Sequence, residues 1–376
     1  MITLGQRLLG AIFLLFALMA SAAHADEPYM LFDVNDGRIL LQNDAFARWY
    51  PASLTKLMTT YVTFRALQKG EVTLLSPVRI TRNASRQPPS KIGLKPGTVL
   101  TLDAALKLML VKSANDIAMA VGENIGGSEE AFVERMNAEA RQLGMTGSHF
   151  TNPNGLFDPE NYTTAHDLAI LVAAIRQQFP QYESYFRIEA VGLGKKVIPN
   201  INVLIGRFDG ADGMKTGFIC AAGFNFIGTA TRDGKTLGAV VLGASSLADR
   251  AEKVAALLQR GFGMAESGSM PTLASLQPYG PGQDQATDMS DRVCSKEARK
   301  ERASELGENG KPIIKSAFIH KMDHDPKVIM VSLGGATGPG GLPPEPVYAN
   351  VPVPTPRPDY VPPKKAAART QSASMQ

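Results

Sequence analysis

The sequence predicts an α+β fold in which an antiparallel β-sheet is flanked by a cluster of helices. Two β-hairpins support this prediction, because at residues 30–41 and 224–242 a pair of short apolar runs is joined by an Asp-Gly turn. Between the hairpins, the apolar residues mostly recur at the spacing of amphipathic helices. Because these strands lie on either side of a helical stretch, we expect both hairpins to belong to one sheet.

The helices are expected in the following order. A helix that begins at Pro51 and includes Ser53 should end near Leu67, just before a glycine. Residues 71–102 are rich in Ser, Pro and Gly and are expected to be irregular with short strands. The further helices are expected at residues 104–111 with Asp103 as the cap, 117–125, 128–143 with Ser128 as the cap, 166–175 and 248–261.

The first residues have the layout of a secretory signal peptide. Arg7 makes a weakly positive start, an apolar run covers residues 8–19, and Ala23-His24-Ala25 offers a small-x-small cleavage site. The run is short for a membrane span, although an uncleaved anchor is the alternative. A signal peptide at residues 1–25 predicts a periplasmic or secreted protein.

The composition excludes several classes of function. The net charge is only +4, and no basic face interleaved with aromatic residues is present, so nucleic acid is not an expected partner. Cysteines and histidines do not show a trustworthy metal-ligand spacing, and we expect neither a metal nor another cofactor. The chain is 44% hydrophobic, which suits a globular protein with a substantial core.

Three short motifs point to nucleophilic catalysis: Ser53-x-x-Lys56, Ser113-Ala114-Asn115 and Lys215-Thr216-Gly217. Each has an ordinary structural explanation when taken alone, such as a solvated lysine or a turn cap. Their joint occurrence, at a helix start, in a break between helices and on a strand, favours a shared catalytic role. This triple is the signature of penicillin-binding proteins and class A β-lactamases.

The first two motifs supply the reacting groups. Ser53 is expected to attack a carbonyl, with Lys56 as the base that takes its proton. A lysine acts as a base only when it is neutral, which requires burial or a nearby cation to lower its pKa. Ser113 can relay a proton toward the leaving amine, and Asn115 can hold either Lys56 or the substrate amide.

The third motif is expected to bind the substrate. Lys215 adds positive potential that keeps Lys56 neutral, and Thr216 offers a hydroxyl to a carboxylate. Gly217 should let the substrate backbone approach the strand edge. The backbone N–H groups of Ser53 and Phe218 are the candidates for an oxyanion hole.

From about residue 28 to residue 262 the chain resembles the low-molecular-mass penicillin-binding proteins, which are serine D-alanyl-D-alanine carboxypeptidases. The resemblance rests on residues 50–58, 94–97, 113–116, 152–156 and 214–217. It implies the transpeptidase fold shared with β-lactamases, and a substrate-carboxylate role for Arg250 in the last helix. This sequence has Asn154 where the family often has His, so that position receives no proton-transfer role.

We assign residues 26–270 to a catalytic domain, because the character of the sequence changes after about Met270. Residues 271–342 then form a charged C-terminal extension, with a solvated helix expected at 291–311 and a strand at 329–333. Residues 343–376 form a Pro-rich tail, with nine prolines between residues 343 and 363, which suits an extended, disordered chain. Its last residues show no apolar face at helical spacing, so membrane attachment through the tail is not predicted.

The implied activity is that of an exported, penicillin-sensitive serine D,D-carboxypeptidase, which removes the terminal D-Ala of peptidoglycan pentapeptides through an acyl-enzyme on Ser53. β-Lactams should acylate the same serine. A D,D-endopeptidase and a class A-like β-lactamase are alternatives that use the same site. A β-lactamase needs a carboxylate that activates the deacylating water, and only Asp158 and Glu160 follow the 152–156 loop closely. A cell-wall-binding scaffold is the non-enzymatic alternative.

Cys220 and Cys294 are the only two cysteines of the chain. In an oxidising compartment they can form one disulfide, which would join the active-site strand to the C-terminal extension. Two unrelated buried thiols are the alternative.

Overall fold

The computed structural model describes residues 27–265, 270–308, 310 and 312–343. The predicted signal peptide at residues 1–25, and the predicted tail after its first residue, lie outside the described residues. The described residues belong to one compact unit, which ends at Pro343. Within these residues, none of the helices has the length and apolar character that crossing a bilayer requires.

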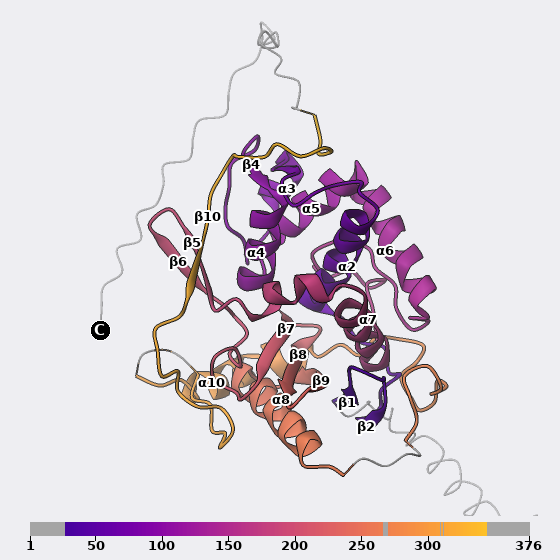
Figure 1. Ribbon diagram of the computed structural model, residues 1–376. Helices are drawn as coiled ribbons and strands as arrows, with labels where there is room; N and C mark the ends of the chain where they lie inside the picture. The colour runs from indigo at the N-terminus through magenta and orange to yellow at the C-terminus, as the bar shows by residue number, and fades with distance from the viewer. Residues whose placement is uncertain (1–26, 266–269, 309, 311, 344–376) are drawn as a thin grey trace, which may run out of the picture. The chain divides into compact units, whose positions relative to one another are not determined.

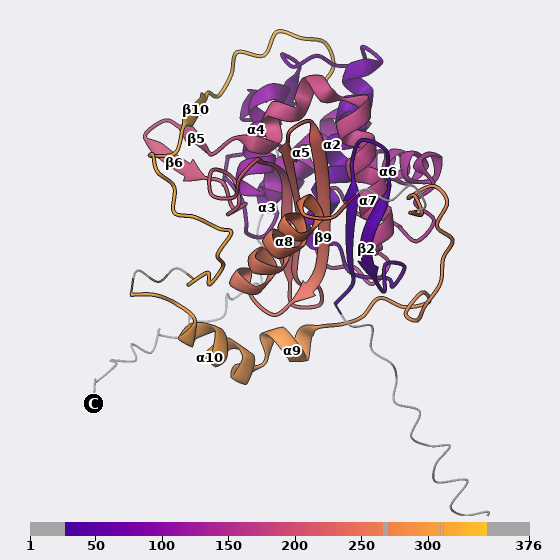
Figure 2. The same ribbon diagram turned by 60° about the horizontal axis from the view of Figure 1, so that its bottom comes forward.

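One five-stranded antiparallel sheet forms the centre of the fold (Figures 1 and 2), with the strand order β2-β1-β9-β8-β7. Both predicted hairpins are confirmed, and β1 pairs with β9, so the two ends of the catalytic region meet in one sheet. Strand β7 lies at the sheet edge and contains the third motif. The strands are β1 (Tyr29–Asp33), β2 (Ile39–Asn43), β7 (Ala211–Ile219), β8 (Gly223–Arg232) and β9 (Lys235–Ala244).

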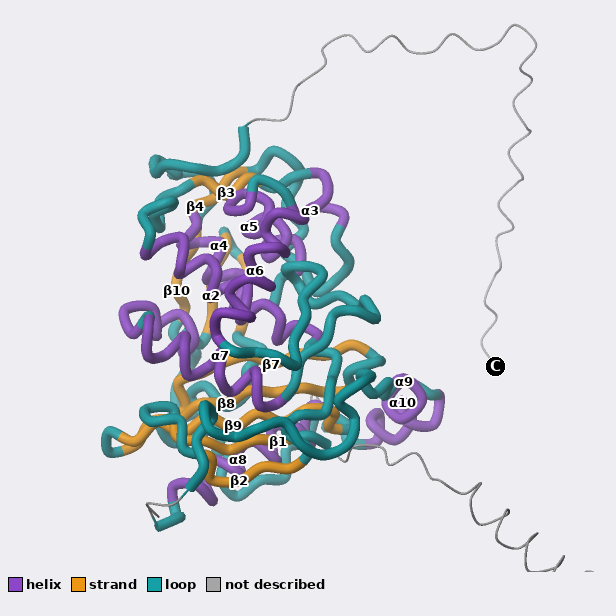
Figure 3. The backbone as a smooth tube through the Cα atoms, turned by 90° about the vertical axis from the view of Figure 1, so that its right-hand side faces the viewer, coloured by secondary structure: helices purple, strands orange, loops and turns teal. Residues whose placement is uncertain are grey.

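Helices cover both faces of this sheet (Figure 3). On one face α8 (Leu247–Phe262) packs against β8 and β9, with Val254 and Leu258 in a shared apolar cluster. On the other face lies the helical cluster, of which α7 packs against β9 and β1. Its helices are α2 (Thr55–Gln68), α4 (Leu102–Lys112), α5 (Asn115–Gly126), α6 (Glu129–Leu143) and α7 (Ala165–Gln178).

The predicted cap of α4 is wrong. Thr101 is the N-cap, because its side chain accepts a hydrogen bond from the backbone N–H of Ala104. Asp103 instead lies in the first turn, where its carboxylate pairs with Lys107 at 2.6 Å and accepts a hydrogen bond from the Tyr185 hydroxyl. Both Thr and Asp are good caps, and the sequence did not separate candidates two residues apart.

Smaller elements complete the described part of the chain. Residues 71–102 contain the predicted short strands, β3 (Pro77–Arg79) and β4 (Val99–Thr101), together with the short helix α3 (Arg82–Arg86). A 3-10 helix, η2 (Pro180–Arg187), precedes a hairpin that the sequence did not predict. That hairpin is formed by β5 (Ala190–Leu193) and β6 (Lys196–Pro199).

The C-terminal extension runs along the catalytic region. The single helix expected at residues 291–311 is wrong, because the chain forms α9 (Ser290–Cys294) and α10 (Lys296–Ser304), with an extended residue, Ser295, between them. No side chain of α10 is buried. The expected strand is confirmed as β10 (Val328–Val331), which pairs in parallel with β5.

Candidate active site

Ser53 lies on a tight 3-10 turn, η1 (Ala52–Leu54), that leads directly into α2. The turn holds Ala52 at a positive φ of 48°, a conformation that costs a residue with a Cβ about 1–2 kcal/mol. Two glycines lie in close contact with the backbone of this turn. A Cβ at Gly155 would lie 1.8 Å from the carbonyl oxygen of Ala52, and a Cβ at Gly217 would lie 2.9 Å from that of Pro51.

The contact at Gly217 gives a reason for this glycine besides the predicted approach of the substrate backbone, which stays a prediction. The Cβ position of Gly217 also lies 3.1 Å from the backbone nitrogen of Ser53. The backbone that approaches this strand residue is therefore the protein's own nucleophile turn. A side chain here would displace Ser53 itself, so the glycine fixes the distance between the first and third motifs.

Lys56 lies one helical turn after Ser53 and is completely buried. Its Nζ lies 3.0 Å from Ser53 Oγ, 2.7 Å from Asn115 Oδ1 and 2.5 Å from the carbonyl oxygen of Asn154. Burial lowers the pKa of Lys56 from 10.5 to about 7, although the Asp116 carboxylate opposes this shift. A large fraction of the amine is thus neutral near pH 7, and burial is the cause; the charge of Lys215, which the sequence suggested for this role, is not among the causes of the shift.

Lys215 is also buried, and its Nζ donates to Ser113 Oγ at 2.8 Å and to the carbonyl of Thr216. Burial lowers the pKa of Lys215, and the positive charges of Lys56 and Arg250 lower it further. Asn115 therefore contacts one buried lysine and Ser113 the other. The second motif bridges the first and the third, as its place between the two helices suggests.

Arg250 extends from α8 to the same strand. Its Nη1 donates to the backbone oxygens of Gly217 at 3.0 Å and Asn225 at 3.2 Å, and burial lowers its pKa to about 10. Asn225 was missed in the sequence, although a polar residue between two phenylalanines in a strand is an unusual signal. Its buried amide donates to the carbonyls of Tyr50 and Pro51, which ties β8 to the segment before Ser53.

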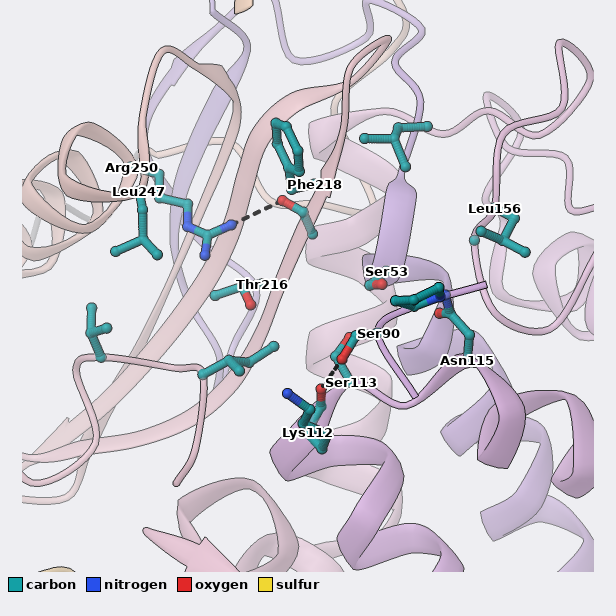
Figure 4. A pocket seen from close by; sticks show the side chains of 16 residues that line it. Ser53, Ser90, Lys112, Ser113, Asn115, Leu156, Thr216, Phe218, Leu247 and Arg250 are labelled. Atoms are coloured by element: carbon teal, nitrogen blue, oxygen red, sulfur yellow. Dashed lines mark hydrogen bonds between the residues drawn. The ribbon is translucent and has the colours of Figure 1, made fainter. Parts of the chain in front are cut away.

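A cavity of about 450 Å³ opens between these elements. Figure 4 shows Ser53, Ser113 and Asn115 facing Thr216 and Arg250 across it. Phe218 lines the cavity and is 42% exposed. Its side chain stacks on Phe224, with the ring centroids 4.2 Å apart. In a strand, the backbone N–H and C=O groups of every second residue point to the same edge. The N–H of Phe218 therefore points to the same edge as the Thr216 carbonyl, which accepts a hydrogen bond from Lys215.

Asn154 has a structural place in the site. It is fully buried, and its side chain donates to Gln87 Oε1 at 2.8 Å, which joins the 152–156 loop to the segment before the second motif. Its backbone carbonyl, not its side chain, is what contacts Lys56. Loop geometry supplies this acceptor, and the residue type alone could not have indicated it.

The structure joins Cys220, in the turn after β7, to Cys294 at the end of α9. The sulfur atoms are 2.02 Å apart, and the two residues are separated by 74 positions in the sequence. The bridge fastens the C-terminal extension to the end of the strand that carries the third motif.

A serine hydroxyl beside a buried amine of lowered pKa, at the edge of an antiparallel sheet, defines a serine-nucleophile acyl-transfer enzyme. The family model described as D-alanyl-D-alanine carboxypeptidase matches residues 17–246. The chain therefore belongs to the D-alanyl-D-alanine carboxypeptidase family. The family, the fold and the enzyme class expected from the sequence are thereby confirmed.

Individual relatives agree. The D-alanyl-D-alanine carboxypeptidase DacF of Bacillus subtilis is 33% identical over 281 residues, which are 70% of this chain and 72% of that protein. The carboxypeptidase DacA of Haemophilus influenzae is 35% identical over 246 residues, 64% of this chain and 63% of the relative. Penicillin-binding protein D2 of Listeria monocytogenes, solved in an ampicillin-bound form, is 28% identical with a TM-score of 0.58, covering 62% of this chain and 96% of that one.

Proposed function

We propose that this chain is an exported serine D,D-carboxypeptidase that removes the terminal D-Ala from peptidoglycan stem peptides. The observation that supports this most directly is the buried Lys56 amine, 3.0 Å from Ser53 Oγ and with a pKa near 7. An amine so placed can accept the serine proton as Ser53 attacks the carbonyl. Export rests on the signal peptide predicted at residues 1–25.

Acylation would use the groups around Ser53. The backbone N–H groups of Ser53 and Phe218 would stabilise the oxyanion, as the placement of Phe218 on the cavity-facing edge of β7 supports. The proton taken by Lys56 would pass through Ser113 to the leaving amine of D-Ala. Ser113 suits this step because it shares the bridging motif with Asn115, which contacts Lys56.

The terminal carboxylate of the substrate would lie at the opposite side of the cavity. Thr216 and Arg250 both line it, and Lys215 lies directly behind Thr216. This cluster of hydroxyl and cationic groups suits an anionic peptide end. The ester on Ser53 would then be hydrolysed by water, which regenerates the serine and releases the shortened stem peptide.

A long-lived penicilloyl-enzyme is expected, because the cavity lacks a carboxylate that could activate a deacylating water. The residues that line the cavity include neither an Asp nor a Glu, and the two carboxylates weighed from the sequence, Asp158 and Glu160, are not among them. Rapid deacylation in the class A manner needs such a group. The relative from Listeria was solved with ampicillin bound, which agrees with a β-lactam as the covalent inhibitor.

Labelling with fluorescent penicillin, together with D-Ala release from a pentapeptide, tests the proposal. Wild type should be labelled and should release D-Ala, whereas Ser53→Ala should do neither, because loss of a catalytic serine costs about 10⁶-fold. Ser85→Ala is the control, since its partly exposed hydroxyl bonds only locally to the carbonyl of Arg82. Labelling of Ser53→Ala at the wild-type level would refute the assignment.

A further inference from the structure

A cavity of about 500 Å³ lies on the face of the sheet that α8 covers, and we call it the α8 cavity. Helix α8 packs mainly against β8 and β9, so the part of this face that β1 and β2 form is less covered (Figure 2). Among the described residues, those that line the α8 cavity and those that line the active-site cavity share no member. The α8 cavity is therefore separate from the site around Ser53.

The floor of the α8 cavity is a row of neighbouring residues across three strands. Tyr29 of β1 pairs with Asn43 of β2 on one side and with Val241 of β9 on the other. Residues paired in this way point to the same face of a sheet. Val241 belongs to the apolar cluster beneath α8, and Tyr29 packs against that cluster while it stays partly exposed. An apolar surface therefore remains open to a ligand here.

One side of α8 forms the wall of the cavity. Lys253, Ala256, Leu257 and Arg260 all line it. They recur at intervals of three and four residues, which places them on one side of the helix. Leu257 is partly exposed and continues the apolar surface of the floor, while Lys253 and Arg260 lie about one turn before and after it. Arg292 of α9 adds a third basic side chain to the lining.

Two of these three basic groups lack an acidic partner. Lys253 Nζ forms ion pairs with the carboxylate of Asp249, at 3.0 Å, and with that of Glu27. Arg260 and Arg292 are exposed, and within the part of the chain that the structure describes neither forms an ion pair. Two guanidinium groups are therefore available to an anion at the edge of an apolar floor.

This combination matches a ligand with two chemically different parts. A guanidinium presents its N–H groups in a planar fork that pairs with two oxygen atoms of one anion. A phosphate ester has three terminal oxygen atoms, enough for two such forks. An apolar chain attached to the phosphate would cover Tyr29 and Leu257 and remove their exposed surface from water. The volume of about 500 Å³ lies in the range of small-molecule sites.

We propose that the α8 cavity binds an anionic amphiphile, a single molecule whose phosphate head pairs with Arg260 and Arg292 and whose alkyl chain lies between α8 and β1. Lys253 is already neutralised by its two carboxylates, so the head is directed to the arginines. This site is independent of the proposed carboxypeptidase activity, because it contains no residue assigned to the chemistry at Ser53.

Calorimetric titration of the mature protein with octyl phosphate, below its micelle concentration, tests the proposal. Inorganic phosphate and octyl glucoside serve as probes of the two halves of the ligand. Octyl phosphate should bind at least about tenfold more tightly than either, because only it offers both the anion and the chain. Equal affinity for inorganic phosphate, or no binding of octyl phosphate, would overturn the proposal. So would binding to phosphatidylglycerol vesicles without binding of octyl phosphate, since that outcome indicates a membrane surface and not a cavity ligand.

The place of binding is tested apart from the enzyme activity. Octyl phosphate should bind equally to wild type, to Ser53→Ala and to protein labelled with penicillin. Loss of binding after labelling would place the amphiphile in the active-site cavity and overturn the assignment to the α8 cavity. Failure of octyl phosphate to bind leaves D-Ala release unaffected, so the two proposals can fail separately.

Arg292→Ala should raise the Kd for octyl phosphate about tenfold, because a charge-assisted pair with the phosphate is lost. Arg292→Lys should recover part of the affinity, since it keeps the charge without the planar fork. Arg187→Ala is the matched control, because Arg187 is an exposed arginine at the end of η2, outside this cavity. An unchanged Kd in Arg292→Ala would remove the arginine pair from the site and overturn the proposal.

Ala256→Trp gives a second measurement that removes no existing contact of the ligand head. Ala256 is exposed and lines the cavity, so an indole there should fill the space of the alkyl chain and abolish detectable binding. Ala303→Trp is its control, because Ala303 is an exposed alanine of α10 that does not line the α8 cavity. Both variants should keep the wild-type rate of penicillin labelling, which shows that they are folded. Wild-type affinity for octyl phosphate in Ala256→Trp would overturn the proposed site.

Discussion

The interior of the active site and the C-terminal extension are held together in opposite ways. In the interior, three cationic side chains are almost completely buried, with exposures of 0% for Lys56, 1% for Lys215 and 6% for Arg250. Each one donates to oxygen atoms of the protein, and burial shifts the pKa of each. In the extension, by contrast, helix α10 buries no side chain, and the extension is fastened to the catalytic region by one disulfide, backbone hydrogen bonds and separate buried side chains such as Val293 and Ile319.

This difference indicates where each kind of change should have its effect. Buried cations depend on the surrounding packing, so a displacement of a few tenths of an ångström alters both geometry and pKa. The extension contributes a few buried apolar side chains but none of the three basic groups, so loosening it should mainly affect stability. Changes in the interior should therefore alter the acylation rate, and changes in the extension should alter the free energy of unfolding.

Among the changes that test this comparison, the largest effect is expected from Gly217→Ala. The added Cβ would lie 2.9 Å from the Pro51 carbonyl and 3.1 Å from the Ser53 nitrogen, so the nucleophile turn must move. Misplacement on this scale should slow penicillin acylation about a hundredfold. The measurement is the second-order labelling rate. Gly263→Ala is the control, because a Cβ there makes only ordinary contacts of 3.5 Å or more; equal rates for both variants would contradict the proposed role of the contact.

The next effect concerns pH. Burial lowers the pKa of Lys56 to about 7, so the amine is mostly charged at about pH 6 and mostly neutral at about pH 8. Only the neutral amine accepts a proton, and the acylation rate should therefore rise up to about tenfold per pH unit below pH 7 and level off above it. Stopped-flow labelling across this range measures it, with a thermal melt at each pH to show that the protein stays folded. A rate that does not change between these pH values would refute Lys56 as the base.

The smallest effect on activity is expected from the double variant Cys220→Ser/Cys294→Ser. The bridge closes a loop with a sequence separation of 74, worth about 4 kcal/mol in the chain-entropy model. Thermal or urea unfolding should show this loss, while D-Ala release per folded molecule stays near the wild-type value. A large drop in D-Ala release without a loss of stability would mean that the extension shapes the catalytic strand, and the comparison between the two regions would fail.

Much of the fold followed from local signals. The hairpin turns at Gly37 and Gly234 need positive φ values, 73° and 79°, which glycine adopts without strain. Ser128 and Gly144 mark the two ends of α6, since a hydroxyl satisfies the first N–H groups and a glycine accepts the left-handed C-cap. Such signals act within a few residues, and the sequence therefore shows them directly.

The residue types of the candidate site could be predicted from the sequence, but the burial and the steric contacts of these residues could not. The sequence by itself determined which groups are present: a serine with a lysine one turn later, a bridging Ser and Asn, and a Lys-Thr-Gly strand. Only the tertiary structure decided that Lys56 is buried, because its neighbours Asn115 and Asn154 come from positions 59 and 98 residues away. Only the tertiary structure also decided that Gly217 contacts the Ser53 turn and that residues 312–314 of the extension line a cavity together with Val203 and Leu247. Desolvation and steric contact depend on what the whole chain brings to one place, and sequence spacing does not contain that information.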